Sequence, residues 1–391
     1  MNAQNTPVHI RLWHHDFWRM AVANFLMAMS VYILIPILPR WLGESQGLTP
    51  QEQGLTMGIF GLGLFVFGAF VSFLVQHYRR NMVCLFAMMV VAALHGLLYY
   101  FDSQRSQFVG LPLILLQRFA LGAVFGLAQM VLSSTLIIDT SESFQRTEAN
   151  YSAAWFSRFA LSLGPMAGLL VERYAGFDFA LLSAVGCVCV AFVLVLLVDF
   201  PFRVPEDDIP TVSLDRFFLT HGFPLFLNLL LITVAVGQLL ALPFSERFYG
   251  MVMAGFLLAL LSWRFVFRDA ELKSEVVTGL ILIGAALLMM LTRTQRVVWY
   301  AAPLFIGLGT GVIGSRFLLF FIKLSRHCQR GTSQSTFFLG WESGIAIGVG
   351  LGIGVLESEF RPVMLTSLVL IVLALIAYHF THDWFVHHKN R

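Results

Sequence analysis

A chain of 391 residues that is 58% hydrophobic and only 12% charged, with a mean hydropathy of +0.78, is far more apolar than soluble domains. In soluble domains about 25% of residues are charged. The net charge of +3 is too small to indicate a nucleic-acid partner, and the 11 histidines show no spacing typical of a metal site. The composition therefore predicts an integral membrane protein and gives no reason to expect a cofactor.

Windows of about 20 apolar residues predict twelve membrane-spanning helices. They are expected to start near Phe17, Gly54, Met82, Val109, Asn150, Phe177, Gly222, Phe248, Val276, Val297, Gly331 and Pro362. The only long polar connection, residues 201–216, separates the first six from the last six. We therefore expect an all-α membrane protein with an N-terminal six-helix bundle (residues 1–200), a cytoplasmic linker (201–221) and a C-terminal six-helix bundle (222–391).

The distribution of Lys and Arg orients these helices. With the N-terminus inside, about 15 of the 25 basic residues fall in cytoplasmic segments and about 7 outside. This bias predicts a multi-pass protein of the cell (inner) membrane with both termini in the cytoplasm. Arg118, Arg158 and Arg316 remain at membrane depth, and Glu342 is the one acidic residue expected there. A charge at the centre of a spanning helix opposes insertion by roughly 2.5 to 3.5 kcal/mol, so such residues usually face a wet cavity or a partner.

The two halves of the chain contain a similar stretch. A shift of 184 residues places QRTEANYSAAWFSRFALSLGPMAGL (Gln145–Leu169) over QRGTSQSTFFLGWESGIAIGVGLGI (Gln329–Ile353). The fifth and eleventh predicted helices are then counterparts, and Arg158 corresponds to Glu342. Parallel repeats of this kind are related by a pseudo-two-fold axis along the membrane normal.

Three short motifs point to a known family. They are YRR at 78–80, QRFALGAVFG at 117–126 and LGPMAG at 163–168. With the six-plus-six layout they make the chain resemble a major facilitator superfamily (MFS) transporter over essentially its whole length. The last motif resembles the fifth-span motif of the drug and metabolite exporter branch. The resemblance implies two pseudo-symmetric halves, a substrate site near the midplane between them, and alternating access.

The chain also departs from the family pattern. Val75 stands where the loop motif would have an Asp, and Tyr78 replaces the Gly of that motif. The acidic residue that many drug–proton antiporters carry in the first span is missing, and Asn24 and Ser30 are the polar residues there. We therefore expect Glu342 to handle the coupling proton.

The spacing of small residues predicts how the two charged helices are oriented. Gly340, Gly344, Gly348 and Gly352 form one stripe on which another helix can pack closely. Glu342 lies about 200° round the helix from Gly340, so it points away from that stripe. Ala160, Gly164 and Gly168 form the equivalent stripe beside Arg158.

Arg158 and Glu342 are therefore expected to approach each other across the cavity or to hold a substrate together. The alternative is a structural ion pair or water-exposed charges. Further candidates for substrate or proton contact are Arg118, Arg316, Asn24, Gln129, Gln238, Trp155 and Trp341. Their structural alternatives are an interhelical contact for Arg118, snorkelling to the interface for Arg316, ties between helices for the amides, and core or lipid contact for the tryptophans.

These observations favour a secondary transporter that exports a small amphipathic or anionic molecule against proton entry. An uptake symporter for an organic anion or a sugar is the second hypothesis. A channel is a third, and an intramembrane enzyme is disfavoured because GWESG (340–344) lacks the strand-to-helix elbow of a nucleophile motif. The chain contains no Walker A sequence, so ATP is not the expected energy source. The expected partners are the cargo, protons and membrane lipid, with no nucleic acid, and the protein is expected to be a monomer.

Overall fold

The computed structural model describes residues 11–103, 109–142, 144–200, 209–266, 271–326 and 329–390. Within these ranges the chain forms helices and connecting loops and no strand. The helices before the linker are α1 (His15–Tyr32), α2 (Leu38–Glu44), α3 (Pro50–Gly63), η1 (Gly68–Phe70), α4 (Val71–His77), α5 (Arg80–Ser103), α6 (Leu111–Val131), the π-helix η2 (Leu132–Leu136), α7 (Ile137–Asp139), α8 (Arg146–Ala175) and α9 (Phe177–Leu196).

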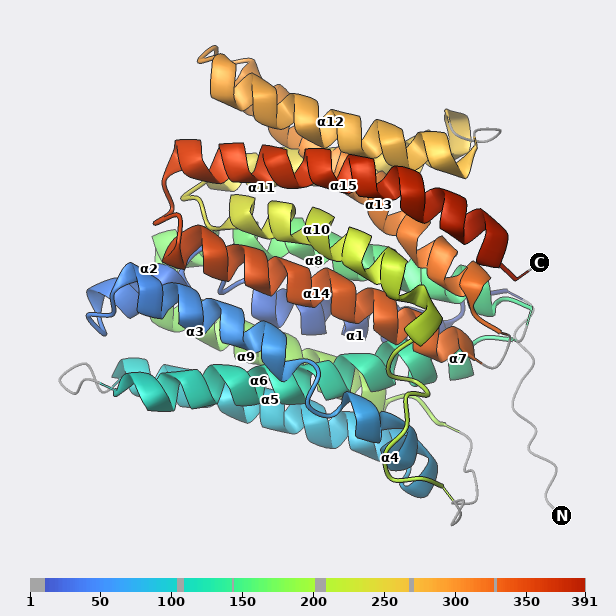
Figure 1. Ribbon diagram of the computed structural model, residues 1–391. Helices are drawn as coiled ribbons and strands as arrows, with labels where there is room; N and C mark the ends of the chain where they lie inside the picture. The colour runs from blue at the N-terminus through green and yellow to red at the C-terminus, as the bar shows by residue number, and fades with distance from the viewer. Residues whose placement is uncertain are drawn as a thin grey trace, which may run out of the picture.

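The helices after the linker are η3 (Thr220–Gly222), α10 (Phe223–Leu240), α11 (Glu246–Phe265), α12 (Leu272–Thr292), α13 (Val298–Leu324), α14 (Arg330–Gly354) and α15 (Phe360–His388). The long helices lie side by side in one bundle (Figure 1). Each begins within four residues of its predicted start, because apolar runs and the polar clusters between them are local features of the sequence.

In the described ranges, ten helical segments are long and apolar enough to cross a membrane. The prediction of an all-α, multi-pass membrane protein is confirmed. Helices α1 and α11 are not among the ten segments, so the count of twelve spans stays a prediction. The start of the expected linker, residues 201–208, lies outside the described residues.

Interruptions of the first, second and fourth predicted spans were not anticipated, and the second is divided into α3, η1 and α4. The first span stops being α-helical after Tyr32 and resumes as α2, with Pro36 in the turns between. Proline has no backbone N–H to donate, so Pro36 weakens the helical hydrogen bonding at this point. The fourth span changes from α6 to the π-helix η2, where the Ser133 and Ser134 hydroxyls donate to the carbonyls of Gln129 and Met130. Such bonds compete with the helical ladder and loosen it locally.

The two small-residue stripes pack as predicted. A Cβ atom on Gly348 of α14 would lie 2.2 Å from the Val234 carbonyl oxygen of α10. A Cβ atom on Gly168 of α8 would lie 2.2 Å from the Ile33 carbonyl oxygen, directly after α1. Each stripe therefore packs on or directly after the first long helix of its own half of the chain, and a methyl group would not fit in either contact.

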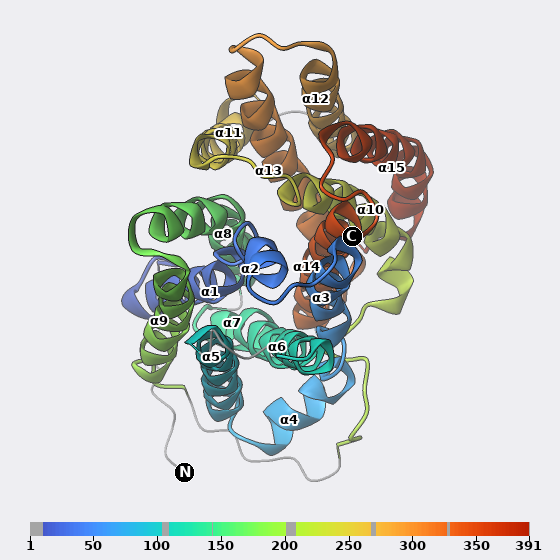
Figure 2. The ribbon, with the colours of Figure 1, turned by 90° about the vertical axis from the view of Figure 1, so that its left-hand side faces the viewer.

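The two most extensive contacts between the helices before the linker and those after it involve α3 and α8. Helix α3 packs on α14, and α8 packs on α11, as the view along the bundle shows (Figure 2). In the first contact a Cβ atom on Gly54 would lie 2.4 Å from the Gly350 carbonyl oxygen. In the second, the Ser162 hydroxyl donates to the Tyr249 carbonyl at 2.5 Å. Both contacts depend on small residues that let backbones approach.

The described part of the linker crosses one end of the bundle, the end where α1 begins and α15 ends (Figure 1). The Ser213 N–H donates to the Ala69 carbonyl at 2.9 Å, and the Arg216 guanidinium donates to the Thr135 hydroxyl at 2.9 Å. The Arg216 backbone N–H donates to the Thr332 hydroxyl of α14 at 2.8 Å. This strap therefore bonds to helices on both sides of the linker.

Candidate functional site

A pocket of about 380 Å³ lies between α1, α6, η2, α8 and α14. Its walls are Asn24, Gln129, Ser133, Ala154, Ser157, Arg158, Gln334, Phe337, Phe338, Trp341 and Glu342. We call it the Arg158 pocket. It brings together five of the nine residues that the sequence singled out, from four helices that are far apart in the chain.

Arg158 is held in this pocket by one hydroxyl and three aromatic rings. Its Nη1 donates to the Ser315 hydroxyl of α13 at 2.9 Å. Its Cζ atom lies 4.9 Å from the ring centre of Trp155, 5.6 Å from Phe337 and 5.9 Å from Trp341. Cation–π contacts of this kind become stronger when water is excluded.

The guanidinium of Arg158 keeps unused hydrogen-bonding capacity. The side chain is 1% exposed, and its Nε and Nη2 atoms are buried without a hydrogen-bond partner among the described residues. Within the same part of the chain no carboxylate forms an ion pair with it. A buried donor that stays unpaired costs free energy, so an anionic group in this pocket would be stabilised.

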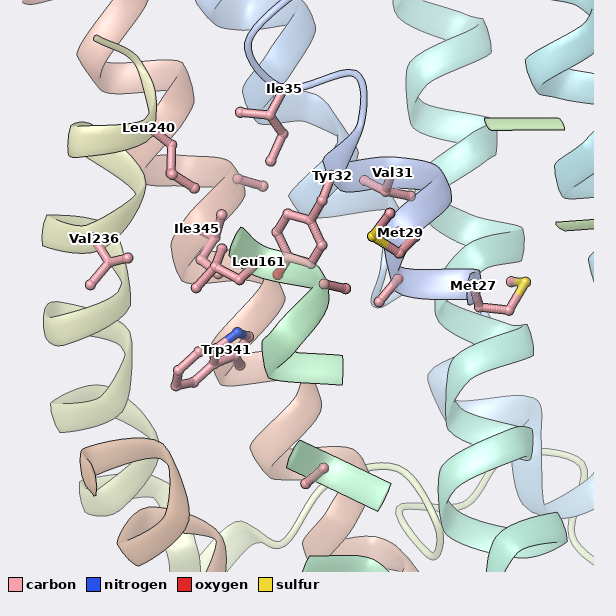
Figure 3. Close-up of a cluster of buried hydrophobic side chains, with 14 of the residues drawn as sticks. Met27, Met29, Val31, Tyr32, Ile35, Leu161, Val236, Leu240, Trp341 and Ile345 are labelled. Carbon is pink, nitrogen blue, oxygen red and sulfur yellow. The ribbon is translucent and has the colours of Figure 1, made fainter. Parts of the chain in front are cut away.

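Glu342 has a different partner from the expected one. Both of its carboxylate oxygens accept from the Tyr32 hydroxyl, each at 3.0 Å. Tyr32 projects from the end of α1 toward Leu161 and Ile345 (Figure 3). The structure thus places Arg158 and Glu342 in the walls of one pocket but, among the described residues, gives them different hydrogen-bond partners and no ion pair with each other. The expected approach of the two charges stays a prediction for another conformation.

A second pocket of about 310 Å³ adjoins the first at Glu342. Its walls are Val31, Tyr32, Ile35, Met57, Phe60, Arg118, Glu342, Ile345, Ala346 and Val349. We call it the Arg118 pocket. The Cζ atom of Arg118 lies 5.3 Å from the ring centre of Phe60. This wall is apolar apart from three side chains, those of Arg118, Tyr32 and Glu342.

The predicted polar and aromatic candidates lie around Arg158. The Asn24 side chain donates to the Ala153 carbonyl at 3.0 Å and to the Ser157 hydroxyl at 2.7 Å, so it fixes α1 against α8 at the pocket wall. Gln129 and Trp341 line the pocket itself. Trp155 is not part of the pocket wall, but its ring contacts the Arg158 guanidinium.

Two candidates lie elsewhere. Arg316 forms a buried ion pair with Glu275 of α12 and lines neither pocket. The side-chain amide oxygen of Gln238 (Oε1) accepts from the Thr366 hydroxyl at 3.1 Å and from the Ser367 hydroxyl at 3.0 Å, which ties α10 to α15. Both side chains join helices. For Gln238 this was the structural alternative, whereas the alternative for Arg316 was snorkelling to the interface, and its bond to Glu275 was not expected.

The sequence analysis missed three residues. Glu275, directly before the expected start of the ninth span near Val276, was not among the candidates, but it is 2% exposed in the first turn of α12 and pairs there with Arg316. Because an arginine at membrane depth such as Arg316 needs a partner, a search for that partner could have identified Glu275. Tyr32 and Ser315 gave no signal, because tyrosine and serine are common in apolar helices. Among the described residues no cluster of His, Cys, Asp or Glu could hold a metal ion.

Solved structures with a similar fold include the following three transporters. The human organic anion transporter MFSD10 (TETRAN) has a TM-score of 0.64 at 16% identity, over 93% of this chain and 99% of that one. A bacterial homologue of the iron transporter ferroportin, in an outward-facing state, has a TM-score of 0.65 at 15% identity, over 94% and 99%. A peptide transporter of the POT family has a TM-score of 0.66 at 12% identity, over 97% and 98%. These identities establish a shared fold and no more.

The sequence comparisons point the same way. No curated protein sequence is recognisably similar to this one. The family model of the Major Facilitator Superfamily, however, matches residues 20–349, which is most of the chain. Its members are transporters of small molecules rather than enzymes. The motifs, the fold and this match agree, and the chain belongs to the Major Facilitator Superfamily.

Proposed function

We propose that this transporter moves a small organic anion with an apolar body across the cell (inner) membrane by alternating access, and that export of the anion is coupled to proton entry. The observation that carries the proposal is the Arg158 guanidinium. It is buried among three aromatic rings, faces a pocket, and has two nitrogen atoms without a hydrogen-bond partner among the described residues.

The pocket favours a cargo with two chemically different ends. A carboxylate, sulfonate or phosphate would satisfy the open side of the guanidinium by charge-assisted hydrogen bonds. The rings of Phe337, Phe338 and Trp341 would cover the apolar body. Asn24 and Gln129 offer hydrogen bonds to further polar groups of the cargo.

Glu342 is the proposed proton carrier. Its carboxylate faces both pockets, and the Tyr32 hydroxyl stabilises the charged form by donating to it. One charge that crosses a potential of 100 mV is worth about 2.3 kcal/mol, and a potential that is negative inside favours both proton entry and anion exit. The LGPMAG motif (163–168) supports export as the direction.

The rest of the proposed arrangement follows the sequence. We place both termini in the cytoplasm, treat residues 1–200 and 222–391 as the two rocking bodies with 201–221 as the linker, and expect a monomer. The separation of the bodies changes the distance between α8 and α14, so Arg158 and Glu342 have room to meet when no cargo lies between them.

Uptake of an organic anion or a sugar with protons is the second candidate, because the same residues would serve a symporter. Transport assays in everted and right-side-out vesicles separate the two. With an imposed proton gradient, an exporter accumulates cargo in everted vesicles, and an uptake symporter accumulates it in right-side-out vesicles.

The anion proposal is tested on the purified protein with matched ligands. Benzoate and benzenesulfonate are compared with neutral benzamide in a thermal-shift screen, followed by larger aromatic anions. A ligand at one hundred times its dissociation constant stabilises the fold by about 2.7 kcal/mol. Anions are expected to stabilise the wild type and Arg158→Lys but not Arg158→Gln. Stabilisation by neutral compounds alone, or anion binding that survives in Arg158→Gln, would show that the proposal is wrong.

A further inference from the structure

The Arg158 pocket and the Arg118 pocket lie one after the other along the bundle. On α14 the first is lined by residues 334 to 342 and the second by residues 342 to 349. At a rise of 1.5 Å per residue, positions 334 and 349 are roughly 22 Å apart. On α6 and η2 the order is the same, with Gln129 and Ser133 in the first pocket and Arg118 in the second.

One pair of side chains stands where the pockets adjoin. Glu342 belongs to both walls, and Tyr32, which donates to it, belongs to the wall of the Arg118 pocket. Because Tyr32 is the last residue of α1, its side chain sits where the helix gives way to a series of turns. The Tyr32–Glu342 pair is therefore a partition between two chambers.

Arg118 in the second chamber has no ion-pair or hydrogen-bond partner among the described residues. Its side chain is 3% exposed, and its Nε and Nη1 atoms are buried without a hydrogen-bond partner in the described part of the chain. The other charged residue of this wall, Glu342, already accepts from Tyr32. Around Arg118 lie the Phe60 ring and aliphatic side chains, and the buried His95 of α5 is close enough to interact with it electrostatically but supplies no negative charge.

The two chambers share one feature. Each holds one buried guanidinium that has unpaired nitrogen atoms among the described residues and an aromatic ring beside it, while the wall of the Arg158 pocket is more polar than that of the Arg118 pocket. An unpaired buried guanidinium is destabilising unless an anion visits it. The function proposed above uses only the Arg158 chamber and leaves Arg118 unexplained.

We infer that the Arg118 pocket is a second anion-binding subsite, which takes the carboxylate, sulfonate or phosphate group of the same organic anion on the far side of the Tyr32–Glu342 partition. The inference rests on the proposed transport of an organic anion. The cargo then binds in turn at two cationic subsites, those of Arg158 and Arg118, and the Tyr32–Glu342 pair lies between them.

Two cysteine reporters test the inference without knowledge of the natural cargo. In a background without the four native cysteines, Met57→Cys reports on the Arg118 pocket and Ser157→Cys on the Arg158 pocket. Each is labelled with an anionic reagent, sulfonatoethyl methanethiosulfonate, and with a cationic one, its trimethylammonium-ethyl analogue. The ratio of the anionic to the cationic labelling rate measures the anion preference of each chamber.

The expected ratios depend on which arginine is changed. Arg118→Gln should lower the ratio at Met57→Cys by about tenfold and leave the ratio at Ser157→Cys within twofold, because a focused charge enriches counter-ions locally by about 10-fold or more. Arg158→Gln should do the reverse. Arg118→Lys keeps the charge and should keep the ratio, and its melting temperature controls for folding. Millimolar benzenesulfonate should slow anionic labelling of Met57→Cys only when Arg118 is present.

The outcomes separate the two proposals. An unchanged ratio at Met57→Cys in folded Arg118→Gln protein overturns the second subsite, as does a failure of both reagents to reach Met57→Cys under turnover conditions. If Arg158→Gln leaves the ratio at Ser157→Cys unchanged while Met57→Cys behaves as expected, the Arg158 assignment fails and the Arg118 subsite stands.

Discussion

The Tyr32 hydroxyl lies 3.0 Å from each of the two carboxylate oxygens of Glu342, although 310 residues separate them in the chain. Among the described residues, Tyr32 is the one hydrogen-bond donor to the Glu342 carboxylate. The bond joins the end of α1 to the middle of α14, one helix from each side of the linker. It therefore ties the two parts of the molecule together at the junction of the two pockets.

Tyr32→Phe should destabilise the protein by about 1 to 3 kcal/mol, because it leaves a buried carboxylate without its donor. In the double variant with Glu342→Leu the loss should be smaller than the sum of the two single losses, since each change removes the same bond. Chemical denaturation of the four proteins in detergent measures this coupling. Additive losses would contradict a direct interaction between the two side chains.

Glu342→Gln should abolish transport driven by a proton gradient while keeping the binding of an aromatic anion. The amide keeps an acceptor for Tyr32 but carries no exchangeable charge. Uptake into proteoliposomes with and without an imposed pH gradient is the measurement, and Glu359→Gln, at an exposed residue before α15, is the matched control. Gradient-driven accumulation at the wild-type rate in Glu342→Gln would assign proton coupling to another residue.

Arg316 and Glu275 should behave as a structural pair. Removal of one partner leaves the other charge buried and should cost about 3 to 5 kcal/mol, whereas joint replacement, as in Arg316→Met with Glu275→Leu, should restore most of the stability. Because neither side chain lines a pocket, the double variant should still bind aromatic anions. Loss of anion binding in a stable double variant would return Arg316 to the list of candidate cargo contacts.

Gly54→Ala should weaken the contact of α3 with α14. The new Cβ atom would lie 2.4 Å from the Gly350 carbonyl oxygen and 2.4 Å from the backbone of Gly354, so the helices must separate. We expect faster labelling of Met57→Cys in this variant. Gly186→Ala is the matched control, because a Cβ atom there would have no neighbour within 4 Å. Equal labelling rates in the two variants would show that this contact does not close the Arg118 pocket.

Arg216→Ala should loosen the strap that crosses the end of the bundle. It removes the 2.9 Å bond to the Thr135 hydroxyl, so hydrogen exchange of residues 213–219 should become about tenfold faster, equivalent to about 1.4 kcal/mol. Arg326→Ala, at an exposed position, is the control. If both variants exchange at the wild-type rate, the backbone bonds of the strap suffice to hold it.

Much of the helical framework could be read from the sequence. Apolar runs, the polar clusters between them and the four-residue spacing of Gly340, Gly344, Gly348 and Gly352 are local patterns, and a helix responds to them wherever it is placed. The glycine stripe of α14 does pack on α10 and leaves Glu342 facing the pockets. Arg158 and Glu342 could likewise be recognised as cavity residues, because charges at membrane depth need water, a ligand or a partner.

The sequence by itself therefore determined an all-α membrane transporter of a known family and five of the eleven residues that line its Arg158 pocket. Only the tertiary structure decided the partner of each charge. Arg158 meets Ser315, 157 residues away, Glu342 meets Tyr32, 310 residues away, and Arg316 meets Glu275, 41 residues away. Periodicity fixes which face of a helix is polar, but the packing of all the helices sets which side chain of another helix reaches that face.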